Sequence, residues 1–181
     1  MDIPLDFSFL NLTDVSELAE EDPRDVNNKC PSRDKEGKFN TKILRLNNNA
    51  IREIKTMEPL EKILQQPLEI TWLDLSFNDL TKIDSCLCNL QSLKILYLQG
   101  NQIDNLKEVD KLGNLPQLSK LALHGNPIDK IKNYRFYVMT KIPQLRNFDM
   151  STISKADRAT ASTGTWKTAE MKGKRKKKEE I

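Results

Sequence analysis

The sequence has few of the residues on which a catalytic centre, a metal site or a disulfide framework would depend. Its 181 residues include one histidine and three cysteines, and 6% of them are aromatic. No uninterrupted run of about 18 apolar residues, the length that a membrane-spanning helix needs, is present. The first residues, MDIPLDFSFLNLTDVSELAEEDP, lack the basic start and the long apolar stretch of a signal peptide. We therefore expect a soluble, intracellular protein.

The three cysteines, Cys30, Cys86 and Cys88, cannot all pair with one another, and a cytosolic setting disfavours disulfides. With a single histidine and no second cysteine cluster, a zinc site would lack ligands. The sequence also has no Gly-rich phosphate loop and no distinguishable pair of catalytic carboxylates. We expect no enzymatic activity, no metal and no cofactor, and we interpret the cysteines as small buried hydrophobic residues.

Positive charge is concentrated at one end of the chain. Residues 167–181 contain seven Lys or Arg against three Glu, whereas the formal net charge of the whole chain is +3. This basic tail, with the sequence KGKRKKKEE, could contact a nucleic acid, an anionic membrane, an acidic protein surface such as a tubulin tail, or an import receptor. A solvated, disordered tail without a specific contact is an equally good interpretation.

One sequence pattern occurs four times in register. It consists of an apolar residue, two variable residues, Leu, one variable residue, Leu, two variable residues, Asn, one variable residue, and then Leu or Ile. The copies are TKILRLNNNAIREI from Thr41, which starts on a polar residue, ITWLDLSFNDLTKI from Ile70, LKILYLQGNQIDNL from Leu93 and LSKLALHGNPIDKI from Leu118. Their asparagines, Asn49, Asn78, Asn101 and Asn126, are 29, 23 and 25 residues apart, within the range of about 20 to 29 residues typical of leucine-rich repeats.

The asparagine of each copy has a structural explanation. After the second Leu the chain must turn sharply, which leaves buried backbone N–H and C=O groups that no sheet neighbour satisfies. A side-chain amide carries donors and an acceptor, so stacked asparagines can pair with the turns of their own and the adjacent coil. A degenerate fifth copy, LRNFDMS from Leu145, keeps Phe148 and Met150 at strand positions but lacks the asparagine, as is typical of a last repeat.

No copy of the pattern is recognisable in the first 40 residues. Their alternating apolar and aromatic residues, in LDFSF from Leu5, favour an extended segment that caps the solenoid or docks a partner. We divide the chain into an amino-terminal segment (1–40), a leucine-rich repeat domain with its carboxy-terminal cap (41–158) and a basic disordered tail (159–181).

The expected fold is an α/β leucine-rich repeat solenoid. Each coil contributes a short parallel strand to the concave face and a helical segment to the convex face, and a carboxy-terminal repeat caps the end. The longest spacing between asparagines includes EIKTMEPLEKILQQPLE, which has apolar residues at helical intervals. We predict a longer helix there, and one or two helical turns in DSCLCNLQS and in KEVDKLGNLPQ.

The residues beside the inward-pointing leucines are expected to face outward from the concave sheet, because side chains alternate along a strand. They form three rows across the coils. The first contains Ile43, Trp72, Ile95, Lys120 and Asn147, the second Arg45, Asp74, Tyr97, Ala122 and Asp149, and the third Asn47, Ser76, Gln99, His124 and Ser151.

An apolar line crosses adjacent coils in the first row, formed by Ile43, Trp72 and Ile95, with Tyr97 beside it. Contiguous exposed apolar patches mark interaction sites, and Trp and Tyr are enriched among binding anchors. Alternatively, the amino-terminal segment covers this line, or its members are scattered surface residues. His124 lies on the same face within HGNP, a turn that also suits a structural role. The candidate partner-binding residues are Ile43, Arg45, Trp72, Asp74, Ile95, Tyr97 and His124.

The repeats, with IDS and LQSLKILYLQGNQIDNL among them, resemble the leucine-rich repeat class that includes the nuclear regulatory subunit of protein phosphatase 1 and axonemal dynein light chain 1. The segment GNPIDKIKNYRFYVMTKIPQLRNFD resembles the carboxy-terminal cap of that class. The matching cap residues are Gly125, Asn126, Pro127, Tyr134, Arg135, Tyr137, Val138, Ile142, Pro143, Leu145 and Asp149. PLDFSF and KADRATA, which lie outside the repeats, make the chain similar to one family of small intracellular leucine-rich repeat proteins over residues 4 to about 166.

This resemblance implies a non-enzymatic, cytoplasmic protein of ciliated cells that is built into the axoneme of a cilium or flagellum. We therefore expect a scaffold or adaptor with axonemal or microtubule-associated protein partners. The alternative suggested by repeat class alone is a regulatory subunit of a protein phosphatase. Nucleic-acid binding is disfavoured, because Asp74 and Asp149 are expected on the concave face and the basic tail has no interleaved aromatics.

Overall fold

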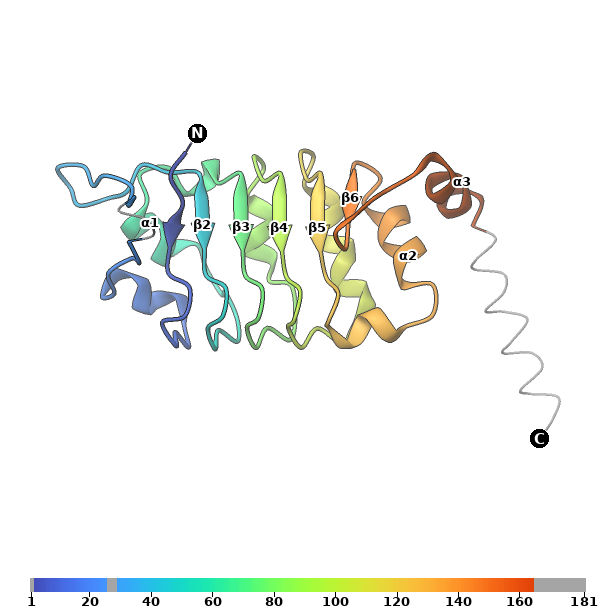
Figure 1. Cartoon of the computed structure of the whole chain (residues 1–181), viewed down its shortest axis with the longest axis horizontal. Coiled ribbons are helices and arrows are strands. Elements are labelled where there is room, and N and C mark those ends of the chain that lie inside the picture. Colours follow the sequence, from blue (N-terminus) through green and yellow to red (C-terminus); the bar gives the residue numbers. More distant parts are fainter. Residues whose placement is uncertain (1, 26–28, 165–181) are drawn as a thin grey trace.

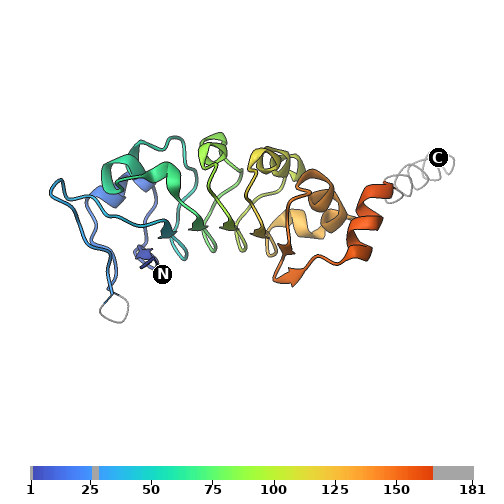
Figure 2. The ribbon, with the colours of Figure 1, turned by 90° about the horizontal axis from the view of Figure 1, so that it is seen from above.

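The computed structural model describes residues 2–25 and 29–164 and shows an elongated solenoid (Figure 1). One sheet runs along one side of the solenoid, and the helical segments of the coils lie on the opposite side (Figure 2). Its strands follow one another in chain order, all parallel except the last, which is antiparallel. They are β1 (Leu5–Asp6), β2 (Ile43–Arg45), β3 (Trp72–Asp74), β4 (Ile95–Tyr97), β5 (Lys120–Ala122), β6 (Asn147–Phe148) and β7 (Ser151–Thr152).

The strands stack without any shift in register from one coil to the next. Trp72, for example, pairs with Ile43 on one side and with Ile95 on the other. Because the register is constant, leucines at the same repeat position form continuous buried columns. One column contains Leu44, Leu73, Leu96 and Leu121, and the next contains Leu46, Leu75, Leu98 and Leu123. The predicted leucine-rich repeat solenoid is confirmed.

The repeat asparagines bridge neighbouring coils as predicted. The Asn101 side chain donates to the Leu98 carbonyl of its own coil at 2.9 Å and to the Leu75 carbonyl of the preceding coil at 3.0 Å. Its Oδ1 accepts from the backbone N–H of Leu80, also in the preceding coil, at 3.0 Å. Asn49, Asn78 and Asn126 make the equivalent bonds. Each amide therefore satisfies three or more backbone groups at a turn that has no sheet partner for them.

The residue before the asparagine position always adopts a left-handed conformation. These residues are Phe9, Asn48, Phe77, Gly100 and Gly125, with φ between 54° and 75°. Glycine and asparagine tolerate this conformation, whereas a bulky side chain makes it strained. At Gly100 an added Cβ would also lie 2.5 Å from the Phe77 ring, so a second constraint excludes a side chain there.

The convex side is built mostly from short 3-10 helices. They are η1 (Val15–Ala19), η2 (Pro67–Glu69), η3 (Ser85–Asn89), η4 (Leu106–Asn114) and η5 (Pro127–Lys130), beside the α-helices α1 (Glu58–Ile63), α2 (Tyr134–Lys141) and α3 (Lys155–Thr163). The longer helix predicted after the first repeat is wrong in length: α1 has six residues and η2 follows it. Its helical face was predicted correctly, since Met57, Leu60, Ile63 and Leu64 are buried.

The absence of a repeat in residues 1–40 is a second expectation that the structure corrects. Leu5 and Phe7 are completely buried at the positions of the two repeat leucines, and Leu12 takes the place of the apolar residue after the asparagine. Leu10 occupies the asparagine position. Among the described residues, β1 is the edge strand of the sheet, so an asparagine here would have no turn of an earlier coil to bridge.

The amino-terminal coil extends the sheet sideways and does not cover the concave face. Its strand β1 pairs with β2, and Arg24 returns past the outer edge of β1, where its N–H donates to the Asp6 carbonyl at 2.7 Å. This contact satisfies part of the backbone edge that would otherwise be open to another chain. The alternative in which this segment folds over the apolar line is thereby excluded for the described residues.

At the carboxy-terminal end the chain reverses at Asp149 and Met150, both left-handed. Ser151 therefore pairs antiparallel with Phe148 and does not continue the third row, contrary to expectation. The expected boundary at residue 158 falls within α3, which continues to Thr163 and packs on α2. The basic part of the predicted tail lies outside the described residues.

Replacing Asn101 with alanine should lower the free energy of unfolding by about 1 to 3 kcal/mol, because three buried backbone groups lose their partner. Chemical denaturation measures this change. Asn47→Ala is the control: Asn47 follows β2, and its side chain is partly exposed. Equal destabilisation by the two substitutions would contradict the bridging role.

Candidate protein-binding face

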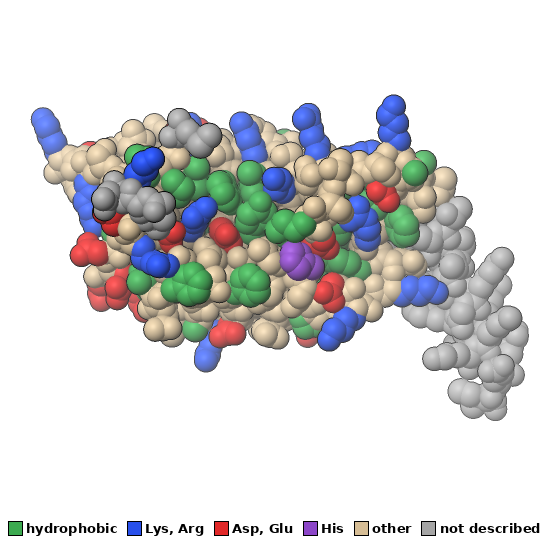
Figure 3. All heavy atoms as spheres, in the orientation of Figure 1, with side chains coloured by type: hydrophobic (Ala, Val, Ile, Leu, Met, Phe, Trp, Pro, Cys, Tyr) green, Lys and Arg blue, Asp and Glu red, His purple; other side chains and the backbone are tan. Residues whose placement is uncertain are grey.

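The structure brings most of the predicted partner-binding residues together on one face of the sheet. Ile43, Trp72 and Ile95 are paired in register on β2, β3 and β4, and Tyr97 and Asp74 are paired two positions further along β4 and β3. All five side chains are partly exposed. Figure 3 shows hydrophobic side chains gathered on this face over β2 to β4, with charged groups among them.

The aromatic residues of this face form one cluster with Arg45. The Trp72 and Tyr97 rings meet edge to face, with centroids 6.1 Å apart and an interplanar angle of 82°. The Arg45 guanidinium lies over the Trp72 ring, 5.3 Å from its centroid. Burial raises the pKa of the Tyr97 phenol, and the nearby Asp74 carboxylate raises it further. The centre of the face therefore combines aromatic surface with both signs of charge.

Two aspartates of the second row are held by the same local hydrogen bonds. Asp74 Oδ1 accepts from the backbone N–H of Ser76 at 3.0 Å and from its hydroxyl at 2.6 Å. Asp6 Oδ1 accepts in the same way from Ser8, at 2.9 and 2.6 Å. Asp6 and Ser8 were missed in the sequence because residues 1–40 were not recognised as a coil. The signal that would have found them is Asp-x-Ser at the repeat position that also holds Asp74 and Ser76.

Three buried polar atoms on this face have no hydrogen-bond partner among the described residues: Trp72 Nε1, Gln99 Oε1 and His124 Nδ1. Buried polar groups are nearly always paired, so unpaired ones concentrated on one surface are unusual. All three belong to the first or third outward row of adjacent coils.

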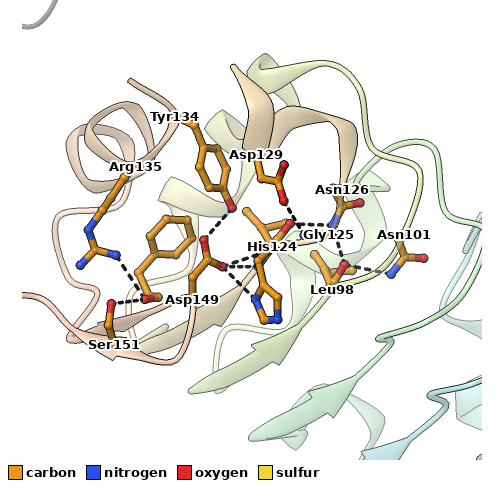
Figure 4. A network of polar contacts seen from close by, with 12 residues as sticks. Leu98, Asn101, His124, Gly125, Asn126, Asp129, Tyr134, Arg135, Asp149 and Ser151 are labelled. Carbon is orange, nitrogen blue, oxygen red and sulfur yellow. Dashed lines mark hydrogen bonds and ion pairs between the residues drawn. The ribbon is translucent and has the colours of Figure 1, made fainter. Parts of the chain in front are cut away.

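His124 and Asp149 belong to the end cap rather than to the open part of the face. Figure 4 shows Asp149 at the centre of a polar network. Its Oδ1 accepts from the backbone N–H groups of Leu123 and His124 at 2.8 and 3.0 Å, and lies 3.5 Å from the imidazole Nδ1 of His124. Its Oδ2 accepts from the Tyr134 hydroxyl at 3.0 Å.

Asp149 thus replaces a missing strand neighbour. Asp149 was expected beside Asp74 on the concave face, but the chain reversal turns its carboxylate to the backbone N–H groups of Leu123 and His124, which follow β5. Gly125 is capped similarly, since its N–H donates to Asp129 Oδ2 at 2.6 Å. A structural role of His124 beside this network is consistent with its turn setting.

Other exposed hydrophobic residues were not predicted. Phe9, Phe77 and Met150 are 62%, 54% and 63% exposed, and all three are left-handed. Phe9 and Phe77 lie at the turn position directly before the repeat asparagine position. Their signal in the sequence is the occurrence of Phe where other coils have Gly or Asn.

Neither a metal site nor a membrane span is evident in the described residues. Within residues 2–25 and 29–164, no group of three His, Cys, Asp or Glu side chains could hold a metal ion. None of the helices in these ranges is long and apolar enough to cross a membrane. Cys86 and Cys88 are half-buried rather than buried as expected, with Sγ donating to the carbonyls of Ile54 and Lys111.

The chain has clear counterparts among known proteins. Residues 43–179 match a family model described as Leucine-rich repeat. The chain belongs to the leucine-rich repeat family. It is 42% identical to leucine-rich repeat-containing protein 51 of Homo sapiens and 43% identical to that of Rattus norvegicus, each over 95% of this chain and 88% of the relative. The similarity to small leucine-rich repeat proteins that PLDFSF and KADRATA indicated is confirmed.

A solved structure shares the fold of this leucine-rich repeat protein. It is a chain of the Drosophila melanogaster SNF/U2A′ complex, with a TM-score of 0.56 and 26% identity, covering 68% of this chain and 67% of that one. Members of the leucine-rich repeat family are typically non-enzymatic protein-interaction modules. The family and the fold together support a protein-binding role.

Replacing Trp72 with alanine should lower the free energy of unfolding by only about 1 to 2 kcal/mol, because the side chain is partly exposed and its ring contacts are an edge-to-face pair and a cation–π contact. Leu73→Ala, one residue away but pointing into the core, should cost about 2 to 5 kcal/mol. Denaturant titration of both variants measures the contrast. A Trp72 variant as unstable as the Leu73 variant would show that Trp72 is a core residue.

The tyrosines should ionise only at unusually high pH. Burial is the main cause that raises the pKa of Tyr97, Tyr134 and Tyr137, and the nearby Asp149 carboxylate adds to the effect at Tyr134. Because the folded pKa values exceed the unfolded value of about 10, their contribution to stability is complete below pH 10 and is lost as the pH rises above it. Ultraviolet titration of phenolate, compared with Tyr134→Phe, measures this. Ionisation of all three tyrosines with a pKa of about 10 in the folded protein would contradict this prediction.

Proposed function

We propose that this protein is a non-enzymatic adaptor that binds a segment of a partner protein on its concave face. The observation that carries the proposal is the line of Ile43, Trp72 and Ile95, with Tyr97 beside it, on a sheet whose register is constant. Trp and Tyr at the centre of a contiguous apolar surface are the residue types that dominate binding energy. The backbone is held by the asparagine bridges, so the face is already arranged for binding and little ordering cost opposes it.

The proposed place of action is the cytoplasm and the axoneme of a cilium or flagellum. This part rests on the resemblance to the repeat class of axonemal dynein light chain 1. The partners would be axonemal or microtubule-associated proteins, and the basic tail would contact an acidic surface nearby. Tail contacts of this kind add affinity without specifying the partner.

A phosphatase regulatory subunit is the other function that the repeat class suggests. It rests on analogy between folds, and fold alone does not determine function. Nucleic acid is a poor partner for this face. The Asp74 carboxylate lies on it, and the positive charge of Arg45 is offset by Asp6, whose carboxylate is 3.6 Å away.

Proximity labelling in ciliated cells, with the label fused to wild type or to Trp72→Ala, tests the proposal. We expect axonemal neighbours around the wild-type protein and loss of most of them in the variant, because the main apolar anchor is removed. Leu68→Ala is the matched control: Leu68 is 50% exposed but lies on η2, outside the sheet. Deletion of residues 167–181 should leave the face-dependent neighbours in place.

Three outcomes would count against the proposal. Neighbours that persist in the Trp72 variant would remove the concave face from the mechanism. Neighbours lost on deletion of the tail alone would assign binding to the tail. Phosphatase or nuclear neighbours in place of axonemal ones would overturn the proposed location.

A further inference from the structure

We propose that Asp74 and Tyr97 form a docking site for an arginine side chain of the partner protein. This inference rests on the proposed function and specifies the chemistry of the partner at the centre of the face. The evidence is that an aspartate bonded to the serine two residues later occurs twice on this face. One of these aspartates, Asp6, pairs with an arginine, and the other, Asp74, makes no ion pair among the described residues.

The repeated unit is an aspartate whose carboxylate is locked by the serine two residues later. In Asp6–Ser8 and in Asp74–Ser76, one carboxylate oxygen accepts from both the backbone N–H and the hydroxyl of the serine. Both aspartates face outward in the second row, on β1 and β3. Their Oδ1 atoms are held in the same way, so each unit offers its Oδ2 atom to a neighbour.

In the first unit that neighbour is an arginine of this chain. Asp6 Oδ2 lies 3.6 Å from the guanidinium of Arg45, which is its register partner on the adjacent strand. The same guanidinium lies over the Trp72 ring. The planar guanidinium of Arg45 thus contacts a carboxylate on one side and an aromatic ring on the other.

In the second unit the corresponding neighbour is Tyr97, the register partner of Asp74 on β4. Tyr97 therefore stands where the first unit has its arginine, so its ring lies beside the carboxylate, and no Lys or Arg among the described residues makes an ion pair with Asp74. Asp74 is partly exposed, whereas Asp6 is 5% exposed. The pKa of the Tyr97 phenol is raised by burial and then by Asp74, which is consistent with a carboxylate beside the ring.

The Asp74 carboxylate can accept from a further cation. Asp6 and Arg45 pair with each other, and Asp74 makes no ion pair among the described residues, with Lys120 of this face lying beyond Ile95 in the first row. Arginine fits better than lysine, because a planar guanidinium can stack on a ring while it donates hydrogen bonds to a carboxylate. Since the apolar line runs directly beside the site, the partner sequence should have apolar residues next to the arginine.

The test is selection of random peptides displayed on phage against the full-length chain, followed by affinity measurement on purified variants. Asp74→Asn keeps an Oδ1 that can accept from Ser76 but removes the charge and the free acceptor. Asp79→Asn, at an exposed position in the turn after β3, is the matched control. We expect enriched peptides with Arg flanked by apolar residues, an affinity loss of about 10- to 100-fold for Asp74→Asn, and little change for Asp79→Asn.

A charge exchange makes the assignment specific. Asp74→Arg should abolish binding of a selected peptide, and replacing the peptide arginine with glutamate should restore it. Peptides that bind equally well to Asp74→Asn but lose affinity for Trp72→Ala would overturn the arginine site and leave the concave-face function intact. Peptides indifferent to both substitutions would overturn both, and equal enrichment of lysine would overturn the preference for a guanidinium.

Discussion

The hydrogen bonds of the repeat asparagines are the constraint on which the rest of the structure depends. Each amide joins carbonyl groups of two successive coils and also accepts an N–H from the earlier one, as Asn101 does with Leu75, Leu98 and Leu80. These bonds fix the turn at the same height in every coil, so the strands that precede the turns align without a shift. Aligned strands place equivalent side chains in straight rows. Both the leucine core and the outward face are consequences of this alignment.

The two ends of the solenoid show what replaces the asparagine when a neighbouring coil is missing. At the first coil, whose strand is the edge of the described sheet, apolar Leu10 takes its position and packs on the core. At the last coil, the chain reverses and the Asp149 carboxylate accepts hydrogen bonds from the backbone N–H groups of Leu123 and His124, directly after β5. The two ends are thus completed differently, by an apolar side chain at the first coil and by a hydrogen-bonded carboxylate at the last.

The sequence predicted the inner coils well because their periodic asparagines determine the register, and the register determines which residues share a row. It failed where that signal was absent. The amino-terminal coil was missed because Leu10 stands at the asparagine position. The reversal at Asp149 and Met150 was missed because left-handed conformations of these residues have no distinctive sequence pattern. Row membership also could not show which aspartate pairs with Arg45, because its strand lies between those of Asp6 and Asp74.

The ion pair of Arg45 with Asp6 distinguishes two aspartates that are otherwise in equivalent positions on the sheet. By register alone, both aspartates are its neighbours, and both are locked by a serine. Asp6 lies in the first coil, where its burial makes an unpaired charge costly, so pairing with Arg45 stabilises the fold at that point. Asp74 remains accessible, and there an unpaired carboxylate costs much less. The Asp-x-Ser unit occurs in two of the described coils, and the difference in burial between them leaves the Asp74 carboxylate accessible.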